Sequence, residues 1–413
     1  QEFAYIPDDL LEILHHKRHE EHEEKHKVFG RLARPEERAF IIASNDHILD
    51  DLTTLLAALR TGKDADTFTL ETSPRFVRDL GLAARLRGNE GGLQRDTVKV
   101  HLEADRAEAF AELRQIWRES ETFNELHQIP TILCEGEWTN PIQETRKKLL
   151  GFIYALPKGK WWHLNSFIAD IKEQNPDFQR TAGDYGAWFI RRVDDDAPLR
   201  GFEHWNDVEG ALIRYFVTGV LFWLGYVDLA AGEKDGEVKA FLVRDDVFTR
   251  KEERGKIVVS SNGLMTIDRY APRAVRYQLA RFGEWMESKN PDAFKYQITT
   301  SSLEKALKQG LKVTHLVALL AKFSETKIPP SLGKALRRWE VNGTEARVKS
   351  ISILRLNKPE DLEALRKSKA GRFLGMALNP TTVEIREGAS QKVMAALIEM
   401  GILMEEEEVK RDL

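Results

Sequence analysis

The chain has 413 residues, of which 42% are hydrophobic and 31% charged, and its formal net charge at pH 7 is −4. These proportions are typical of a soluble globular protein with buried cores, and the length allows about two to four domains. The slightly acidic balance excludes a uniformly cationic nucleic-acid binder, so any phosphate contact must come from a local group of Lys and Arg side chains. The single cysteine, Cys134, excludes an intrachain disulfide and a four-cysteine zinc site. It favours a structural thiol in a reducing, cytoplasmic protein.

The N-terminal residues predict the end of a domain. The chain begins at Gln1 within an apparently structured phrase that contains Phe3, Tyr5 and Pro7, so we expect a fragment or processed form. Residues 1–14 are interpreted as the end of an upstream domain. No apolar run is long enough to span a bilayer and no signal peptide is visible, so no membrane partner is expected.

A linker is predicted at 15–30, because residues 15–27 contain no apolar side chain. On a helix, His15, His19, His22 and His26 would lie along one stripe, since they are spaced by four, three and four positions. Imidazole is a good zinc ligand, so a metal site is one interpretation. A helix that is polar all round has nothing to bury, however, and a solvated linker is the interpretation that the composition favours.

Residues 31–140 predict a helical domain. Leucines recur at helical spacing between Asp46 and Arg60, where Asn45 or Asp46 can begin a helix and Gly62 can end it. A second amphipathic helix is expected at about 104–119, after a glycine-rich polar loop at 87–96. No catalytic motif is visible in this part of the chain.

Residues 141–250 have the order of elements of a winged helix-turn-helix. Helices are expected at 143–155, 164–173 and 206–216, followed by a strand that begins after Val220, a turn at 232–236 and a returning strand at 238–243. The segment from Asn175 to Glu203 is longer than the tight turn of a DNA-reading helix-turn-helix. This insertion is the main objection to a winged helix.

Residues 251–413 predict an α/β domain. The motifs that carry the prediction are a strand hairpin at Asn262-Gly263, the run 277–282, the run 296–299, a helix through Leu303 and Leu307, Gly310-Leu311, and the run from Phe323 to Pro329. Their order over 256–341 resembles the helicase-associated domain on the N-terminal side of XPB-type helicases. The resemblance implies an accessory role beside a helicase motor, in DNA engagement and partner contacts. Within 256–341 we expect helices at 273–287, 301–309, 313–323 and 330–341, and a type I′ turn at Asn262-Gly263 with both residues at positive φ. Beyond it, a β-α-β-α tail is expected to continue the same domain, with strands at 348–356 and 382–385, a helix that begins at Pro359, and a helix at 390–400. The predicted fold class is therefore α+β and predominantly helical, a winged helix-turn-helix joined to an XPB N-terminal-like α/β domain.

The sequence contains four Gly-Lys pairs, and each of them could belong to an ATP-binding loop. A phosphate-binding loop requires Gly-Lys followed by Ser or Thr, because the hydroxyl holds magnesium. None of the pairs is so followed: they are Gly62-Lys63, Gly159-Lys160, Gly255-Lys256 and Gly333-Lys334. We therefore expect no helicase activity from this chain alone, no catalytic residues and no cofactor.

Cations interleaved with aromatic residues mark the candidate nucleic-acid surface. Bases stack on aromatic rings and phosphates pair with Lys or Arg, so this mixture is typical of nucleic-acid binding. Trp161 and Trp162 are assigned to the core instead, and His163 and His204 to helix entry. Asp194-Asp195-Asp196 is interpreted as a surface turn rather than a magnesium site. The candidate contacts are Lys158, Lys160, Arg180, Arg191, Arg192, Lys234 and Lys239.

Three functions remain open from the sequence. The first is a non-enzymatic protein that binds duplex or forked DNA and assists a helicase in repair, transcription or defence. The second is an interaction subunit that docks a separate helicase or nuclease without touching DNA. The third, an enzyme of unrecognised type, has no nucleophile, metal cluster or phosphate loop in its favour.

Overall fold

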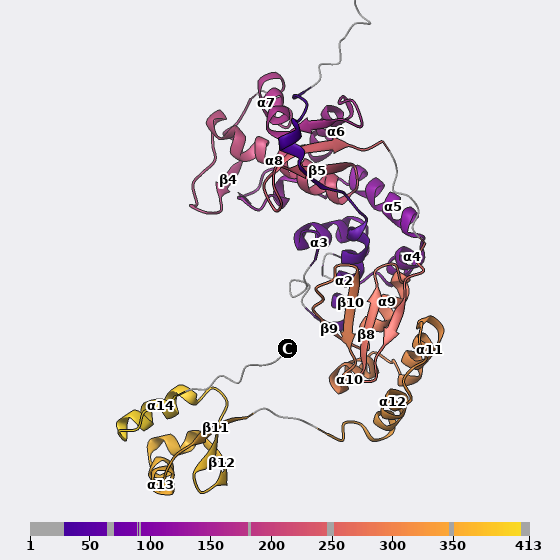
Figure 1. Cartoon of the computed structure of the whole chain (residues 1–413). Helices are drawn as coiled ribbons and strands as arrows, with labels where there is room; N and C mark the ends of the chain where they lie inside the picture. The colour runs from indigo at the N-terminus through magenta and orange to yellow at the C-terminus, as the bar shows by residue number, and fades with distance from the viewer. Residues whose placement is uncertain are drawn as a thin grey trace, which may run out of the picture. The chain divides into compact units, whose positions relative to one another are not determined.

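The computed structural model describes residues 29–63, 70–88, 90, 92–180, 183–245, 252–346 and 351–405. The chain divides into two compact units, Gln1–Val341 and Asn342–Leu413, and both mix helices with strands (Figure 1). The predicted upstream domain end and the histidine tract with His15, His19, His22 and His26 lie outside the described residues. None of the helices described is both long and apolar enough to cross a membrane.

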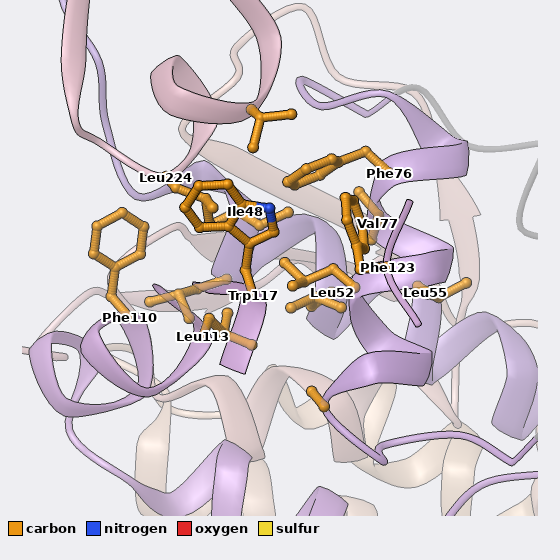
Figure 2. Packing of buried hydrophobic residues seen from close by; sticks show 14 of the residues in the cluster. Ile48, Leu52, Leu55, Phe76, Val77, Phe110, Leu113, Trp117, Phe123 and Leu224 are labelled. Carbon is orange, nitrogen blue, oxygen red and sulfur yellow. The ribbon is translucent and has the colours of Figure 1, made fainter. Parts of the chain in front are cut away.

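Four helices form the start of the first unit: α2 (His47–Thr61), α3 (Pro74–Ala83), α4 (Arg95–Glu103) and α5 (Arg106–Glu119). The helices predicted near 46–60 and 104–119 are confirmed, and Gly62 ends α2 with a left-handed φ of 68°. The apolar stripes of α2, α3 and α5 meet around Trp117, which is fully buried (Figure 2). Leu52 of α2 and Phe76 of α3 belong to the same cluster, so the helical spacing of the sequence is explained by this shared core.

Two short strands interrupt the part of the chain that was predicted to be helical. β1 (Phe40–Ile42) pairs with β5 (Val227–Ala231), and β2 (Ile132–Glu135) pairs with β4 (Phe189–Arg192). Strands this short show too little alternation to be recognised in sequence, and their partners are distant along the chain. The purely helical interpretation of 31–140 is therefore wrong at both places.

Three helices and then a strand hairpin appear in the predicted order between 142 and 243, with an additional short strand at Trp161–His163 that was not predicted. They are α6 (Ile142–Tyr154), β3 (Trp161–His163), α7 (Leu164–Gln174), a third helix, β5 (Val227–Ala231) and β6 (Val238–Val243). The third helix is continuous through Asn206–Gly210, Ala211–Tyr215 and Phe216–Leu221, with π-helical turns in its first and last parts. The sheet is antiparallel in the order β1-β5-β6-β3. Between α7 and the third helix, the insertion contributes β4 (Phe189–Arg192), which pairs with β2.

The rest of the first unit is a four-stranded sheet with helices. Its elements are β7 (Ile257–Val259), β8 (Leu264–Asp268), α9 (Arg273–Ala280), β9 (Glu284–Met286), β10 (Ala293–Gln297), α10 (Thr300–Lys308), α11 (Val313–Phe323) and α12 (Pro330–Asn342). The sheet order is β7-β8-β10-β9. Helices predicted at 301–309, 313–323 and 330–341 are confirmed.

Two local predictions in this region are wrong. A helix was expected over 273–287, but α9 ends at Ala280 and Trp285 pairs with Tyr296 in a strand. A Cβ at Gly283 would lie 2.7 Å from Cβ of Tyr296, so glycine permits this close approach. The β7–β8 hairpin was expected to place two residues at positive φ, yet of Asn262 and Gly263 only Gly263 has one, at 84°. The N–H of Gly263 donates to the carbonyl of Ser260, giving a longer loop with glycine in the left-handed position.

The second unit has its own core. It contains β11 (Ser352–Arg355), α13 (Pro359–Lys367), β12 (Leu374–Asn379), β13 (Thr382–Ile385) and α14 (Ser390–Glu399), with sheet order β11-β13-β12. The predicted tail lacked β12 and was assigned to the preceding domain. Leu365, Val383, Val393 and Leu397 are fully buried in a cluster separate from that of the first unit. Short 3₁₀ helices complete the described elements at Pro35–Arg38, Leu126–Gln128, Phe202–His204 and Lys369–Phe373.

A buried ion network fastens the N-terminal helices to the region that begins at β7. Asp50 of α2 is 1% exposed and accepts hydrogen bonds from Arg106 Nη2 and from Arg269 Nε, both at 2.8 Å. Asp46 pairs with the same two arginines. Arg276 of α9 donates to the backbone oxygen of Asp50 at 2.6 Å. One hydrophobic cluster likewise extends from Phe29 to Leu336, so the three predicted domains of this unit share a core.

Candidate nucleic-acid interface

The third helix of the 142–243 region, where a DNA-reading helix would be expected, is buried on several sides. Val208, Leu212, Phe216 and Val220 are each at most 1% exposed. The ring centroid of Phe216 lies 5.8 Å from that of Trp117 on α5. Immediately after the helix, Trp223 lies 4.9 Å from Phe76 on α3. Because the N-terminal helices cover it, this helix cannot enter a major groove without separation from them.

Arg180 is not a surface cation. It is 6% exposed, and its Nε lies 2.5 Å from Oε1 of Glu209 in the third helix, whose carboxylate is also buried. Its guanidinium lies over the rings of Tyr185 and Trp188, at 5.1 and 4.3 Å. Burial raises the pKa of Glu209, and Arg180 opposes that shift. The interpretation of Arg180 as a nucleic-acid contact is therefore wrong, because the insertion folds back and uses it as an internal ion pair.

Arg191 and Arg192 reach the surface on β4 but are already paired. Their side chains are 36% and 32% exposed. Each one bridges two carboxylates, at distances of 2.5 and 2.7 Å for Arg191 and 3.0 and 3.3 Å for Arg192; the partners are Glu135, Asp196, Asp195 and Asp207. The Asp194–Asp196 segment is a turn, as predicted, and its carboxylates neutralise these arginines. A phosphate would have to compete with both partners.

The four lysine candidates are all exposed, and they fall into two pairs. Lys158 and Lys160 precede β3, and Lys158 Nζ lies 3.7 Å from Asp245. Lys234 is in the β5–β6 turn and Lys239 is on β6. Since Trp161 pairs with Leu242 and His163 with Ala240, Lys160 and Lys239 are about four residues apart along the sheet, roughly 13 Å. The lysines therefore form two small basic positions at opposite ends of one sheet.

The dense aromatic residues belong mostly to the core. Trp162 is 5% exposed, as predicted, while Trp161 is half-buried against a small alanine cluster. Trp188 stacks on Trp138 with ring centroids 4.9 Å apart and planes 11° apart. Phe189, 54% exposed, lies beneath the guanidinium of Arg200. Few aromatic faces in the described insertion are left for base stacking.

The remaining candidates have structural explanations. His163 begins α7, and its Nδ1 accepts a hydrogen bond from the backbone N–H of Ser166 at 3.2 Å. His204 lies beside Asp207, at 3.1 Å. Burial raises the pKa of Cys134 to about 11, so its thiol stays protonated and unreactive at neutral pH. Within the described residues, no three His, Cys, Asp or Glu side chains gather as a metal site would require.

The buried ion network was not anticipated from the sequence. Asp46 and Asp50 are four residues apart on a helix whose neighbours are apolar, which was the one available signal. Burial acts to raise the pKa of Asp50, but the positive charges of Arg106, Arg276 and Arg269 outweigh it, and the pKa is lowered. The network is a joint within the fold and carries no chemistry of its own.

Residues 257–378 match a family model described as the helicase conserved C-terminal domain. The match covers less than a third of the chain and extends from β7 into β12. A search of curated proteins gives no match. We call residues 257–378 the helicase-related segment. The segment overlaps the region 256–341 and supports a helicase-related role. The XPB-type assignment stays a prediction, since the matching model describes a helicase C-terminal domain.

Proposed function

We propose that this chain is a helicase-accessory protein that hydrolyses no ATP itself and contacts DNA through phosphates. The observation that carries the proposal is the match of the helicase-related segment, whose first elements are fastened by the buried ion network to the rest of the first unit. A motor that docks on this segment would therefore carry the 142–243 region with it as one body.

The 142–243 region is proposed to be a winged helix that has lost groove reading. Its three helices and hairpin have the required order, and the strand between the first two helices pairs with the last strand of the hairpin. Because the third helix is covered, this region would contact the phosphate backbone of DNA rather than its bases. The exposed lysines Lys158, Lys160, Lys234 and Lys239 are the proposed contacts. Arg191 and Arg192 could join them only by exchanging their carboxylate partners.

The strength of this contact can be bounded. Each phosphate neutralised by a Lys or Arg lowers the slope of log K against log salt by about 0.9 on duplex DNA, so four contacts give at most about −3.6. Binding should be independent of sequence and lost at moderate salt, because acidic side chains surround the two lysine pairs. Glu233, Asp235 and Glu237, for example, flank Lys234 in or beside the same turn.

Fluorescence anisotropy with duplex and forked DNA over a salt series tests the proposal. Lys158→Glu with Lys160→Glu, and Lys234→Glu with Lys239→Glu, should each weaken binding and flatten the salt slope by up to about 2. Lys147→Glu with Lys148→Glu makes the same charge change at exposed positions of α6 and should have a smaller effect, without flattening the slope. Arg191→Glu with Arg192→Glu should weaken binding less than either lysine pair. Absence of binding at low salt, or equal losses in all variants, contradicts the DNA contact.

A second candidate function is docking of a separate helicase or nuclease. It is favoured by β1, the outer strand of its sheet among the described residues, where Phe40, Ile41 and Ile42 are 45%, 63% and 42% exposed. An exposed apolar edge strand offers both backbone hydrogen bonds and apolar area to another chain. Ile41→Lys should abolish partner recovery in a pull-down while leaving DNA affinity unchanged if this function holds.

A further inference from the structure

A cavity of about 270 Å³ lies among α2, α4 and α9 in the first unit. Figure 1 shows α4 beside α9, and the two helices are in contact. Cations supply much of the lining: Arg60 near the end of α2, Arg95 and Lys99 on α4, and Arg281 just after α9. The cavity thus joins the helicase-related segment, which contributes Arg281, to helices from the beginning of the unit.

Arg281 is a buried charge without a carboxylate partner among the described residues. It is 8% exposed, its Nε donates to Oε1 of Gln309 at 3.0 Å, and its Nη1 donates to Oε1 of Gln278 at 2.8 Å. Its Nη2 makes no hydrogen bond with any described residue. Burial lowers the pKa of Arg281, and the positive charges of Arg60 and Arg95 lower it further. An anion in the cavity would compensate this guanidinium.

Three further cations line the cavity. Within the described residues Arg60, Arg95 and Lys99 form no ion pair, and the only acidic lining residue is the exposed Glu103. By contrast, the buried arginines Arg106, Arg146 and Arg180 each contact a carboxylate within 2.8 Å. A buried charge is costly unless it is paired, and this fold pairs those three with acidic side chains. Arg276 is also buried without an ion pair among the described residues, but it lies within the Asp50 network, whereas Arg281 lies at a cavity.

We propose that this cavity binds a nucleoside phosphate, either a free nucleotide or the phosphorylated end of a DNA strand. The phosphate would accept a hydrogen bond from Nη2 of Arg281 and would lie near Arg60 and Arg95, since guanidinium groups bind phosphate oxygens strongly. The nucleoside would lie against the apolar lining, which includes Val98, Leu102 and Tyr277. The volume is near the lower end of ligand pockets, about 300 Å³, and has room for one nucleotide rather than a duplex.

This site goes beyond the phosphate contacts proposed for the 142–243 region, because it shares no residue with them. Loss of one therefore leaves the other intact, and the two proposals fail separately. Variants at Lys158, Lys160, Lys234 and Lys239 should bind nucleotide normally. Variants of the cavity should retain salt-dependent binding of duplex DNA with blunt, unphosphorylated ends.

Isothermal titration of the full chain with adenosine monophosphate, inorganic phosphate and adenosine tests the site. Adenosine monophosphate should bind at least about 10-fold more tightly than either part alone. Arg281→Gln should lower its affinity by about 10-fold or more, the loss expected for one charge-assisted hydrogen bond. Because Arg281 is buried, Arg95→Glu and Lys99→Glu provide exposed alternatives that preserve the fold, and the melting temperature checks this. Lys148→Glu, exposed on α6, is the matched control and should bind as the wild type does.

Anisotropy with single-stranded oligonucleotides that carry a 5′-phosphate, a 3′-phosphate or hydroxyl ends distinguishes the two sources of ligand. Tighter binding of either phosphorylated strand, lost in Lys99→Glu, assigns the site to DNA ends. Binding of adenosine monophosphate with no preference among the strands assigns it to a free nucleotide. If neither nucleotide nor terminal phosphate binds, if the folded Arg95→Glu and Lys99→Glu variants bind unchanged, or if inorganic phosphate binds as tightly as the nucleotide, the proposal is overturned.

Discussion

Asp50→Asn should destabilise the first unit severely. Asp50 is 1% exposed, and its carboxylate holds Arg106 and Arg269 at 2.8 Å each. The substitution keeps the shape of the side chain but leaves those guanidinium groups buried with less compensating charge. Removing one partner of a buried ion pair costs about 3–5 kcal/mol. An unfolding entropy of about 2.1 cal/mol/K per residue over the unit Gln1–Val341 corresponds to about 1.4 °C per kcal/mol, so we expect the melting temperature to fall by roughly 4–7 °C.

The matched control is Asp195→Asn, which makes the same chemical change in an exposed pair. Asp195 lies 3.0 Å from Arg192, and its side chain is 55% exposed, so solvent screens the pair and its loss should change stability little. Both variants can be compared by circular dichroism melting and by urea unfolding at pH 7. If Asp50→Asn melts within 2 °C of Asp195→Asn, a difference well below the roughly 4 °C expected for the buried network, the network does not fasten the unit as argued.

Three further variants test the burial of two titratable side chains and the backbone conformation of one glycine. Burial raises the pKa of Asp51 from 3.8 to about 7. The folded state therefore loses stability as pH rises from about 4 to 7, by at most about 4 kcal/mol. Asp51→Asn should remove that loss, and its gain in stability over the wild type in urea unfolding should be larger at pH 8 than at pH 4.5. Burial lowers the pKa of His101 to about 3, so the stability of the folded state falls as pH drops below about 6.5. His101→Phe should reduce this loss of stability at acidic pH, and an unchanged loss would contradict the burial of His101. Gly263, at φ 84°, should cost roughly 1–2 kcal/mol when replaced by alanine, measured by the same unfolding; a neutral result would show that the hairpin relaxes.

Helices and strands with a regular apolar pattern and with turn or capping residues near their ends could be predicted from the sequence, because these signals are local. The α11 helix at Val313–Phe323 and the strands Val238–Val243 and Thr382–Ile385 have the predicted bounds. Each combines an apolar pattern with nearby turn or capping residues. The end of α9 at Ala280 could not be seen, since the sequence remains helix-compatible and only the pairing of Trp285 with Tyr296 selects a strand.

Whether the candidate site residues are exposed or buried depends mostly on contacts between residues that are distant in the sequence. No local sequence pattern indicates these contacts. Arg180 has the same sequence surroundings as an exposed cation, yet Glu209 of the third helix buries it. The helix itself has the expected length, but Trp117 and Phe76 cover it from a part of the chain about 100 residues earlier. The cavity at Arg281 likewise draws its cations from three separate helices.

The buried ion network also has a consequence for how the chain is made. Asp50 accepts hydrogen bonds from Arg269 and Arg276, whose positions follow it by 219 and 226 residues. At a synthesis rate of about 5–20 residues per second, the carboxylate leaves the ribosome roughly 10–45 s before these two partners. During that interval Arg106, which follows Asp50 by 56 residues, is already available to pair with Asp46 and Asp50, but the hydrogen bonds from Arg269 and Arg276 are not. The network is therefore complete only once the start of the helicase-related segment has been synthesised.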